Sequence, residues 1–377
     1  MINFDHNATT PLLPEVAAGL ARAFGEDTAN PSSIHRAGQR ARQRLDVARA
    51  QVASLLHAEP RDIVFVGSGS EADALALKGV FFGRREAHKR RIVSSAQEHP
   101  AVLFALEQLR AHGAEVVLVR PDPDGRVSPE EMEAALTPPT LLCSLMWVNN
   151  ETGVIQPVAE VARRCAARGV LFHTDAVQAV GKVPVSLAEV PADLLSLSGH
   201  KLGAPAGIGA LVVRRGVLLE SLLAGHQESG RRGGTPSLPF IEALALALAS
   251  GVRDLVEHAS ALEVLRDALE SKVLEALPGV RVNGGGERVS NTTNLMFPGT
   301  DGEALLIALD LAGVLASSGA ACASGSLKAS HVLTSMGRSE AEARSSLRFS
   351  LGRGVGLAEV AEVVRLLVAQ VRGRPFA

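Results

Sequence analysis

Several residue types are scarce in this sequence of 377 residues: tyrosine is absent, tryptophan occurs once and cysteine occurs three times. Three cysteines in a chain of this length give no disulfide framework, which favours a reducing compartment, and we expect a cytoplasmic location. No run of about 18 apolar residues is present that could span a bilayer. The N-terminal MINFDHNATT also lacks the apolar stretch of a signal peptide. We therefore expect no membrane association.

The charge is nearly balanced, with 38 basic against 40 acidic side chains and a formal net charge of −2. This balance gives no electrostatic footprint for direct nucleic-acid binding or for an anionic membrane. The densest basic run, GRREAHKRR at 83–91, is typical of a solvated loop before a strand. Hydrophobic residues make up 46% of the chain, which excludes a disordered protein.

The length favours two packed regions, because a single core usually stops growing at about 250–300 residues. Through the first two thirds, short apolar strands alternate with helix-period segments, as in the strand 61–67 and the helix 70–82. This order predicts an α/β region with a mostly parallel sheet covered by helices on both faces. The stretch 238–277 predicts a long helix that crosses to the second region. The last third, with strands in VRVNG, NTTNLMFP and RFSLG, predicts a smaller α+β region.

Polar groups of mixed type follow the apolar strands of the first region. Ligands of open α/β sheets bind beyond the carboxyl ends of the strands, so these groups are expected to meet at one edge. A structural protein has little need for such a set. The segments are GSGSE (67–71), QEHP (97–100), NNETG (149–153), DAVQ (175–178) and SGHK (198–201).

Three of these segments combine into one chemistry. Gly69 and Ser70 open a helix whose amides and dipole favour an anion, although a simple serine cap is the plainer interpretation. Asp175 follows a buried strand and needs a cationic partner, unless it only caps the next helix. Lys201, desolvated at a sheet edge, is suited to attack a carbonyl. A phosphate, a pyridinium and a carbonyl together predict a pyridoxal phosphate site, with Lys201 as the Schiff-base lysine and Asp175 at the ring nitrogen.

Four further side chains fit this prediction. Gln178 lies one helical turn after Asp175 and could donate a hydrogen bond to the same ligand. Ser198 and His200 share the turn of the lysine and could donate to the phosphate. His99 precedes a proline at a helix start, where a structural histidine is the ordinary interpretation and a stacking or proton-transferring imidazole is the alternative. With no tyrosine in the chain, a ring stack is expected from His99.

Longer motifs extend the pattern along the whole chain. In chain order, the segments are DHNATTPLLPEV, NPSSIHRAG, QEHPAV, MWVNNETG, FHTDAVQAVGK, SLSGHKL, SSGAACASGSL and LRFSLGR, within a pattern that runs from about residue 3 to past residue 360. In these motifs the chain resembles the pyridoxal phosphate-dependent cysteine desulfurases of the NifS and IscS type, within the class V aminotransferases. Ser70 stands where threonine is usual, which keeps the hydroxyl.

The resemblance implies a fold and a division of the chain. It implies fold type I of the pyridoxal phosphate-dependent transferases, with a large cofactor-binding domain over 16–260. Both chain ends, 1–15 and 261–377, are expected to form the small domain, which carries the loop of the catalytic cysteine. It also implies a homodimer whose subunits share each active site.

The resemblance further implies the role of each site residue. Lys201, Cys322 and His99 are expected to be catalytic, and no metal ion is expected. Arg348 and Asn150 are expected to bind the substrate, L-cysteine, the arginine by a bidentate pair with its carboxylate. Thr235 in RRGGTP is expected to reach the phosphate of the partner subunit. The expected cofactor ligands are Gly69, Ser70, Asn150, Asp175, Gln178, Ser198, His200, Lys201 and Thr235.

The expected reaction removes sulfur from cysteine, gives alanine and leaves a persulfide on Cys322. Cys322 lies among tiny residues with no apolar face, unlike Cys143 and Cys165, which fall in a strand and a helix. We expect residues from about 324 to 334 to be poorly ordered, because they offer little apolar area. This sulfurtransferase would pass sulfur to an acceptor protein for iron–sulfur cluster assembly or tRNA thiolation. The alternatives are a selenocysteine lyase, a class V aminotransferase without need of Cys322, and a non-enzymatic scaffold.

Overall fold

A seven-stranded sheet organises the first region of the computed structural model, which describes residues 1–25, 29–83, 90–318 and 329–373. Neighbouring strands pair in parallel except for β8, which runs antiparallel to both of its neighbours. The predicted mostly parallel α/β sheet is therefore confirmed. The strand order is β2 (Ile63–Val66), β8 (Gly209–Val213), β7 (Leu194–Ser198), β6 (Leu171–Asp175), β5 (Thr140–Ser144), β3 (Arg91–Ser95) and β4 (Glu115–Val119).

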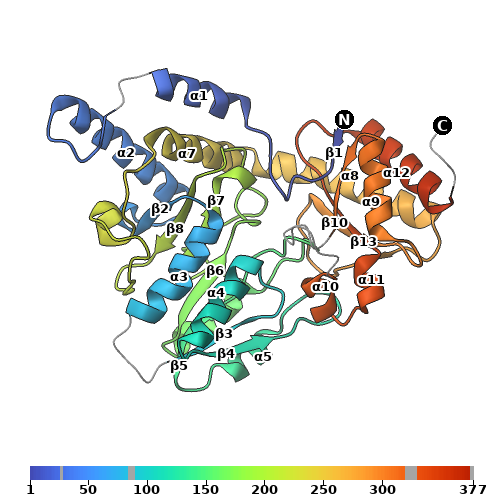
Figure 1. Cartoon of the computed structure of the whole chain (residues 1–377), viewed down its shortest axis with the longest axis horizontal. Coiled ribbons are helices and arrows are strands. Elements are labelled where there is room, and N and C mark those ends of the chain that lie inside the picture. The colour runs from blue at the N-terminus through green and yellow to red at the C-terminus, as the bar shows by residue number, and fades with distance from the viewer. Residues whose placement is uncertain (26–28, 84–89, 319–328, 374–377) are drawn as a thin grey trace.

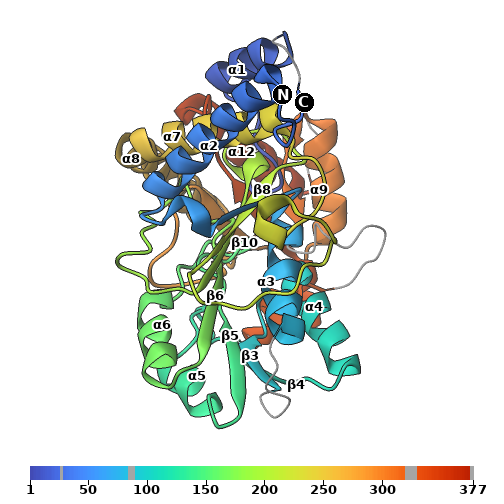
Figure 2. The same ribbon diagram turned by 90° about the vertical axis from the view of Figure 1, so that its left-hand side faces the viewer.

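Helices cover both faces of this sheet, and Figure 2 shows α5 and α6 on the opposite side of the strands from α3 and α4. The strands are buried on both faces, so they are continuous apolar runs such as IVFV in β2. One face packs on α3 (Gly69–Gly83) and α4 (Pro100–Ala111). The other packs on α1 (Pro14–Gly25), α2 (Arg36–Leu55), α5 (Pro129–Ala135), α6 (Val158–Ala167) and α7 (Leu238–Arg253).

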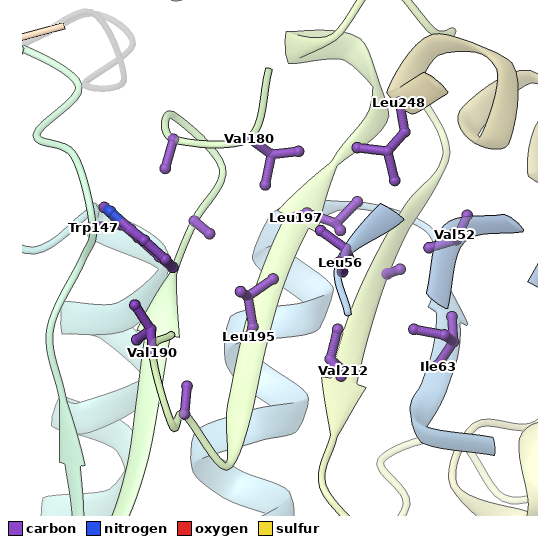
Figure 3. Close-up of a cluster of buried hydrophobic side chains, with 14 of the residues drawn as sticks. Val52, Leu56, Ile63, Trp147, Val180, Val190, Leu195, Leu197, Val212 and Leu248 are labelled. Atoms are coloured by element: carbon purple, nitrogen blue, oxygen red, sulfur yellow. The ribbon is translucent and has the colours of Figure 1, made fainter. Parts of the chain in front are cut away.

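The core on this second face is continuous from the sheet to α2 and α7. Figure 3 shows Leu195, Leu197 and Val212 of the sheet facing Leu56 and Leu248. All five side chains are 3% exposed or less. Burial of each such aliphatic side chain stabilises the fold by about 1.5–3 kcal/mol. This packing fixes β6 and β7, whose last residues are Asp175 and Ser198.

The second region has its own sheet and its own core, with Phe4, Phe297 and Phe349 fully buried. β10 (Thr292–Met296) pairs antiparallel with β13 (Ser346–Ser350) and β9 (Arg281–Val282), and β12 (Ser317–Ser318) pairs with β13. The N-terminal β1 (Ile2–Asn3) pairs in parallel with β11 (Val314–Leu315). The helices are α8 (Leu255–Ala276), α9 (Gly302–Leu311), α10 (His331–Ser335), α11 (Glu340–Arg344) and α12 (Leu357–Val371). In Figure 1, α8 runs from α7 into this region, where the N-terminus also lies.

Three expectations about the elements need correction. The single helix predicted over 238–277 is two helices, α7 and α8, that are separated at Asp254. The backbone N–H of Asp254 donates to the Ser250 carbonyl at the end of α7, and its carboxylate accepts from Arg253 and Arg353. The strand predicted over TLLCSLMWV ends at Ser144, because the chain then turns back so that Val148 pairs with Ile155. Residues 331–334 were expected to be poorly ordered but form α10, because Val332 and Leu333 are buried. The remaining part of that expectation, 324–328, lies outside the described residues.

Within the described part of the chain, no helix combines the length and the apolar character needed to cross a membrane.

Candidate functional site

Lys201 ends a single 3-10 turn, Gly199–Lys201, that directly follows β7. Its Nζ donates to the backbone carbonyls of Asn7 and Ala8, each at 2.6 Å. The N-terminal segment therefore passes directly over the lysine, and Thr10 also donates from its backbone to the carbonyl of His200 at 2.9 Å. The expected position of Lys201 at the edge of a buried sheet is confirmed by this geometry.

Asp175 is the last residue of β6, the strand that neighbours β7. Its side chain is 5% exposed, and its Oδ1 accepts from the backbone N–H of Val177 at 2.9 Å. Burial raises the pKa of Asp175 to about 6, while the Val177 N–H and the nearby Lys201 act in the opposite direction. A buried carboxylate in this setting is stabilised by any cation that enters the site beside it.

His99 caps the N-terminus of α4, and its Nδ1 accepts from the backbone N–H of Ala101 at 3.2 Å. Burial, together with the nearby Lys201 and His331, lowers the pKa of His99 to about 4. The imidazole is therefore neutral at physiological pH. Because Nδ1 is the acceptor, the proton of the neutral ring is on Nε2. The structural interpretation of this histidine is confirmed, because it caps a helix. Its stacking or proton-transferring role stays a prediction, for a ring that lies near Lys201.

Arg348 lies in the middle of β13 and is 3% exposed. Its Nη2 binds the Asp5 carboxylate at 2.7 Å, and its Nη1 donates to the carbonyl of Asn150 at 3.1 Å. Two buried polar atoms here, Arg348 Nε and Asn150 Oδ1, have no hydrogen-bond partner among the described residues. Unpartnered buried polar atoms are rare in native proteins, so this pair is a candidate contact for a polar ligand.

Asn7 joins these residues and was missed at the level of sequence. Its carbonyl accepts from Lys201 and from Gln178 Nε2 at 3.1 Å, and its Nδ2 donates to the Asn150 carbonyl at 3.2 Å. Its Oδ1 accepts from Lys182 at 2.8 Å. Lys182 also donates to Gln178. Burial, together with Lys201 and Arg348, holds the pKa of Lys182 well below its usual range.

The signal for Asn7 and Lys182 was present in two quoted motifs. Asn7 stands in DHNATT and Lys182 in DAVQAVGK, but neither position follows a predicted strand directly. Contacts between the first residues and the sheet edge are long-range, so the sequence could not show them. Both lysines line a cavity of about 190 Å³, together with His6 and His258.

Gly69 and Ser70, two of the expected phosphate ligands, form the N-terminus of α3. Gly69 packs so closely on the end of β7 that an added Cβ would lie 3.1 Å from Ser198 Cβ and 2.8 Å from Val177 Cγ2. Only glycine leaves this helix start open to a ligand. Ser70 is exposed beside it, and Ser198 is 3% exposed. His200 lies on the other side of the turn, with Nδ1 3.2 Å from Thr9 Oγ1.

Thr235 is not brought to this group. Thr235 is exposed and lines a separate pocket with Phe65 and Arg232. Cys322 lies outside the described residues; the preceding strand β12 pairs Ser317 with Arg348. Cys143 and Cys165 are fully buried, as expected for small core residues.

The fold and the site together define a class of protein. It is a two-region α/β protein with an aspartate and a lysine at the ends of two adjacent parallel strands. The model of the class-V aminotransferase family matches residues 2–363. A protein called cysteine desulfurase 2 from Trichormus variabilis is 44% identical over 369 residues, which are 97% of this chain and 92% of that protein. The chain belongs to the class-V aminotransferase family.

Solved structures agree over nearly the full length. A structure described as a NifS-like protein superposes with a TM-score of 0.92 at 33% identity, covering 98% of this chain and 99% of that one. A second, described as SspA in complex with cysteine, gives a TM-score of 0.83 at 34% identity, over 93% and 99% of the two chains. These likenesses confirm the expected resemblance and the expected fold.

Proposed function

We propose that this protein is a pyridoxal phosphate-dependent cysteine desulfurase that converts L-cysteine to L-alanine and collects the sulfur as a persulfide on Cys322. The observation that carries the proposal is the placement of the buried Asp175 and of Lys201 at the ends of two adjacent parallel strands. The names of the relatives and the cysteine-bound neighbour support the substrate.

The residues present fit the cofactor. Burial raises the pKa of the Asp175 carboxyl, with Val177 N–H and Lys201 acting against it, and a protonated ring nitrogen would favour the ionised form further. Gly69 leaves the start of a 15-residue helix open, where backbone amides favour a phosphate, with Ser70 next in the helix and Ser198 packed against Gly69. Asn150 Oδ1 is a buried acceptor without a partner among the described residues.

When bound, pyridoxal phosphate supplies an electron sink for the pair left at the α-carbon of the substrate. Lys201 Nζ, held by two carbonyls, is the amine that we assign to the covalent link with the cofactor. His99 Nε2 carries the proton of a neutral ring and is suited to donate to the cofactor or to stack beside it. Gln178 and Asn150 are proposed to orient the ring oxygen and the substrate.

Arg348 is proposed to bind the substrate carboxylate, since its buried Nε–H has no acceptor among the described residues. Cys322 is proposed to be the nucleophile. Its thiolate attacks the substrate sulfur, the sulfur–carbon bond breaks, and the electron pair and a proton go to the carbon, which leaves as the methyl group of alanine. The sulfur stays bound to Cys322 as a persulfide, so the step needs no external oxidant.

The persulfide must leave for turnover to continue. We propose an acceptor protein of iron–sulfur cluster assembly or of tRNA thiolation, and a cytoplasmic location, where Cys322 remains reduced. We also propose a homodimer in which Thr235 contributes to the phosphate site of the partner. The exposure of Thr235, away from the Lys201 group, supports that assignment. We propose domain boundaries at residues 15 and 260, because the two regions have separate hydrophobic cores.

The test begins with the cofactor. The purified protein should be yellow, and borohydride should attach the cofactor irreversibly to the peptide that contains Lys201, as seen by mass spectrometry. Lys201→Ala should abolish the attachment. A colourless protein that takes up no cofactor after reconstitution would refute the proposal.

The test then separates the reactions. With cysteine and a reductant, the enzyme should release alanine and sulfide in equal amounts. Transfer of an amino group to a keto acid without sulfide would instead identify an aminotransferase. A much higher kcat/KM for selenocysteine than for cysteine would identify a selenocysteine lyase.

A further inference from the structure

A second buried carboxyl group, that of Asp73, lies close to Asp175. Asp73 is 1% exposed and lies about one turn into α3, whose other buried residues are all apolar or glycine. Single ligand atoms of Asp73, Asp175 and His99 all lie within 4.8 Å of one another. The proposed function assigns no role to Asp73, so its presence beside the ring-binding aspartate requires an explanation.

One basic side chain beside Asp73 is a neutral histidine. His173 Nε2 is 3.7 Å from Asp73 Oδ1, and burial lowers the pKa of His173 to about 3, so this ring is neutral. The same ring binds Ser144 Oγ at 2.9 Å and Ser196 Oγ at 3.0 Å. Asp73 Oδ1 itself has no hydrogen-bond partner within the described part of the chain.

The two carboxyl groups differ in what favours ionisation. Asp175 accepts a backbone N–H and lies near Lys201. Asp73 interacts with the Ser196 hydroxyl but faces two other acids, Asp175 and the buried Glu98. Burial and these two acids hold the pKa of Asp73 well above its usual range. Two buried carboxylates this close cannot both ionise without a large cost, so a single proton stays with the pair.

We propose that Asp73 is a positioning residue that keeps this proton and, as a neutral carboxylic acid, stabilises Asp175 in its ionised form. Asp175 is thereby held ready for a protonated ring nitrogen, while His173, Ser144 and Ser196 fix the orientation of the acid. A neutral acid kept beside an ionised one is an established way to set two carboxyl groups to different states. This inference rests on the proposed function for the identity of the ring, but the protonation of Asp73 does not depend on it.

The first experiment measures the proton directly by infrared spectroscopy of the cofactor-free and the cofactor-loaded protein near neutral pH. The spectrum of the wild type minus that of Asp73→Asn should contain the C=O stretching band of a protonated carboxylic acid. Glu98→Gln is the matched control, because it removes the other buried acid and identifies its separate band. Absence of a band assigned to Asp73 would overturn the proposal.

The second experiment measures the dissociation constant of pyridoxal phosphate by absorbance titration of the cofactor-free protein. Asp73→Asn keeps a neutral donor of the same shape and should bind within about threefold of the wild type. Asp73→Leu removes the donor and should bind about tenfold more weakly or worse, as expected for loss of a hydrogen bond to a charged group. Glu98→Gln should bind like the wild type.

The outcomes separate the two proposals. Equal weakening in Asp73→Asn and Asp73→Leu, or no weakening in Asp73→Leu, would overturn the role of Asp73. If Asp73→Leu fails to fold, the infrared band of the Asp73→Asn pair still decides the protonation state. If the wild type takes up no cofactor, the proposed function fails, while the infrared result for Asp73 remains valid.

Discussion

Truncation of Arg348 tests whether its guanidinium binds the carboxylate of the substrate. In Arg348→Ala we expect the KM for cysteine to rise about tenfold to a hundredfold, with the cofactor still bound. The guanidinium uses Nη1 and Nη2 on the Asn150 carbonyl and Asp5, whereas the buried Nε–H has no acceptor among the described residues. A carboxylate that accepts from this group gains a charge-assisted hydrogen bond of about 1.5–3 kcal/mol, and each 1.4 kcal/mol is a factor of ten.

The same substitution removes a structural ion pair, so a control is needed. Asp5 is 25% exposed, and water compensates part of its charge when Arg348 is lost. The free energy of unfolding should therefore fall by only about 1–3 kcal/mol. Asp5→Asn breaks the same ion pair but keeps the guanidinium. It should lower stability without raising the KM, because the arginine is then less engaged and remains available to the substrate carboxylate.

The assay measures alanine formation over a range of cysteine concentrations, with cofactor occupancy followed by absorbance and stability by thermal unfolding. A normal KM in Arg348→Ala at full occupancy would show that the substrate carboxylate binds elsewhere. An equal rise of KM in Asp5→Asn would show that the effect is structural, and the assignment of Arg348 would be withdrawn.

Three further predictions concern the nucleophile, pH and assembly. Cys322→Ser should keep cofactor binding but release no sulfide, and iodoacetamide should modify Cys322 faster than the fully buried Cys143; normal sulfide release would exclude Cys322 as the nucleophile. Burial raises the pKa of Glu151, which accepts from Ser330, to about 7 from the usual 4.5, so between these pH values the folded state binds a proton that the unfolded state has lost. Stability should therefore fall from pH 4.5 to 7 by up to roughly 3 kcal/mol and be constant above, and Glu151→Gln should flatten this slope in urea titrations; an unchanged slope would contradict the shift. Light scattering should show a dimer, and Thr235→Ala should weaken cofactor binding in it. A fully active monomer would contradict the shared site.

The order of strands and helices was accessible from the sequence, because buried parallel strands are continuous apolar runs and amphipathic helices repeat every 3.6 residues. Motifs directly after strands, such as SGHK and DAVQ, could be assigned to one edge of the sheet for the same reason. The break between α7 and α8 was not accessible, since both sides of Asp254 are equally helical in pattern. Helix α10 was missed because five residues carry too little periodicity.

The site divides in the same way. The sequence by itself grouped Lys201, Asp175 and His99, because each belongs to a polar segment that follows a predicted strand, and polar residues there need partners. Only the tertiary structure decided that Asn7 accepts hydrogen bonds from Lys182 and Lys201. It also decided that Asp73 lies close to Asp175. The physical reason is sequence separation. Local patterns report which face of an element is buried, but which distant side chains meet there is set by the packing of the whole chain.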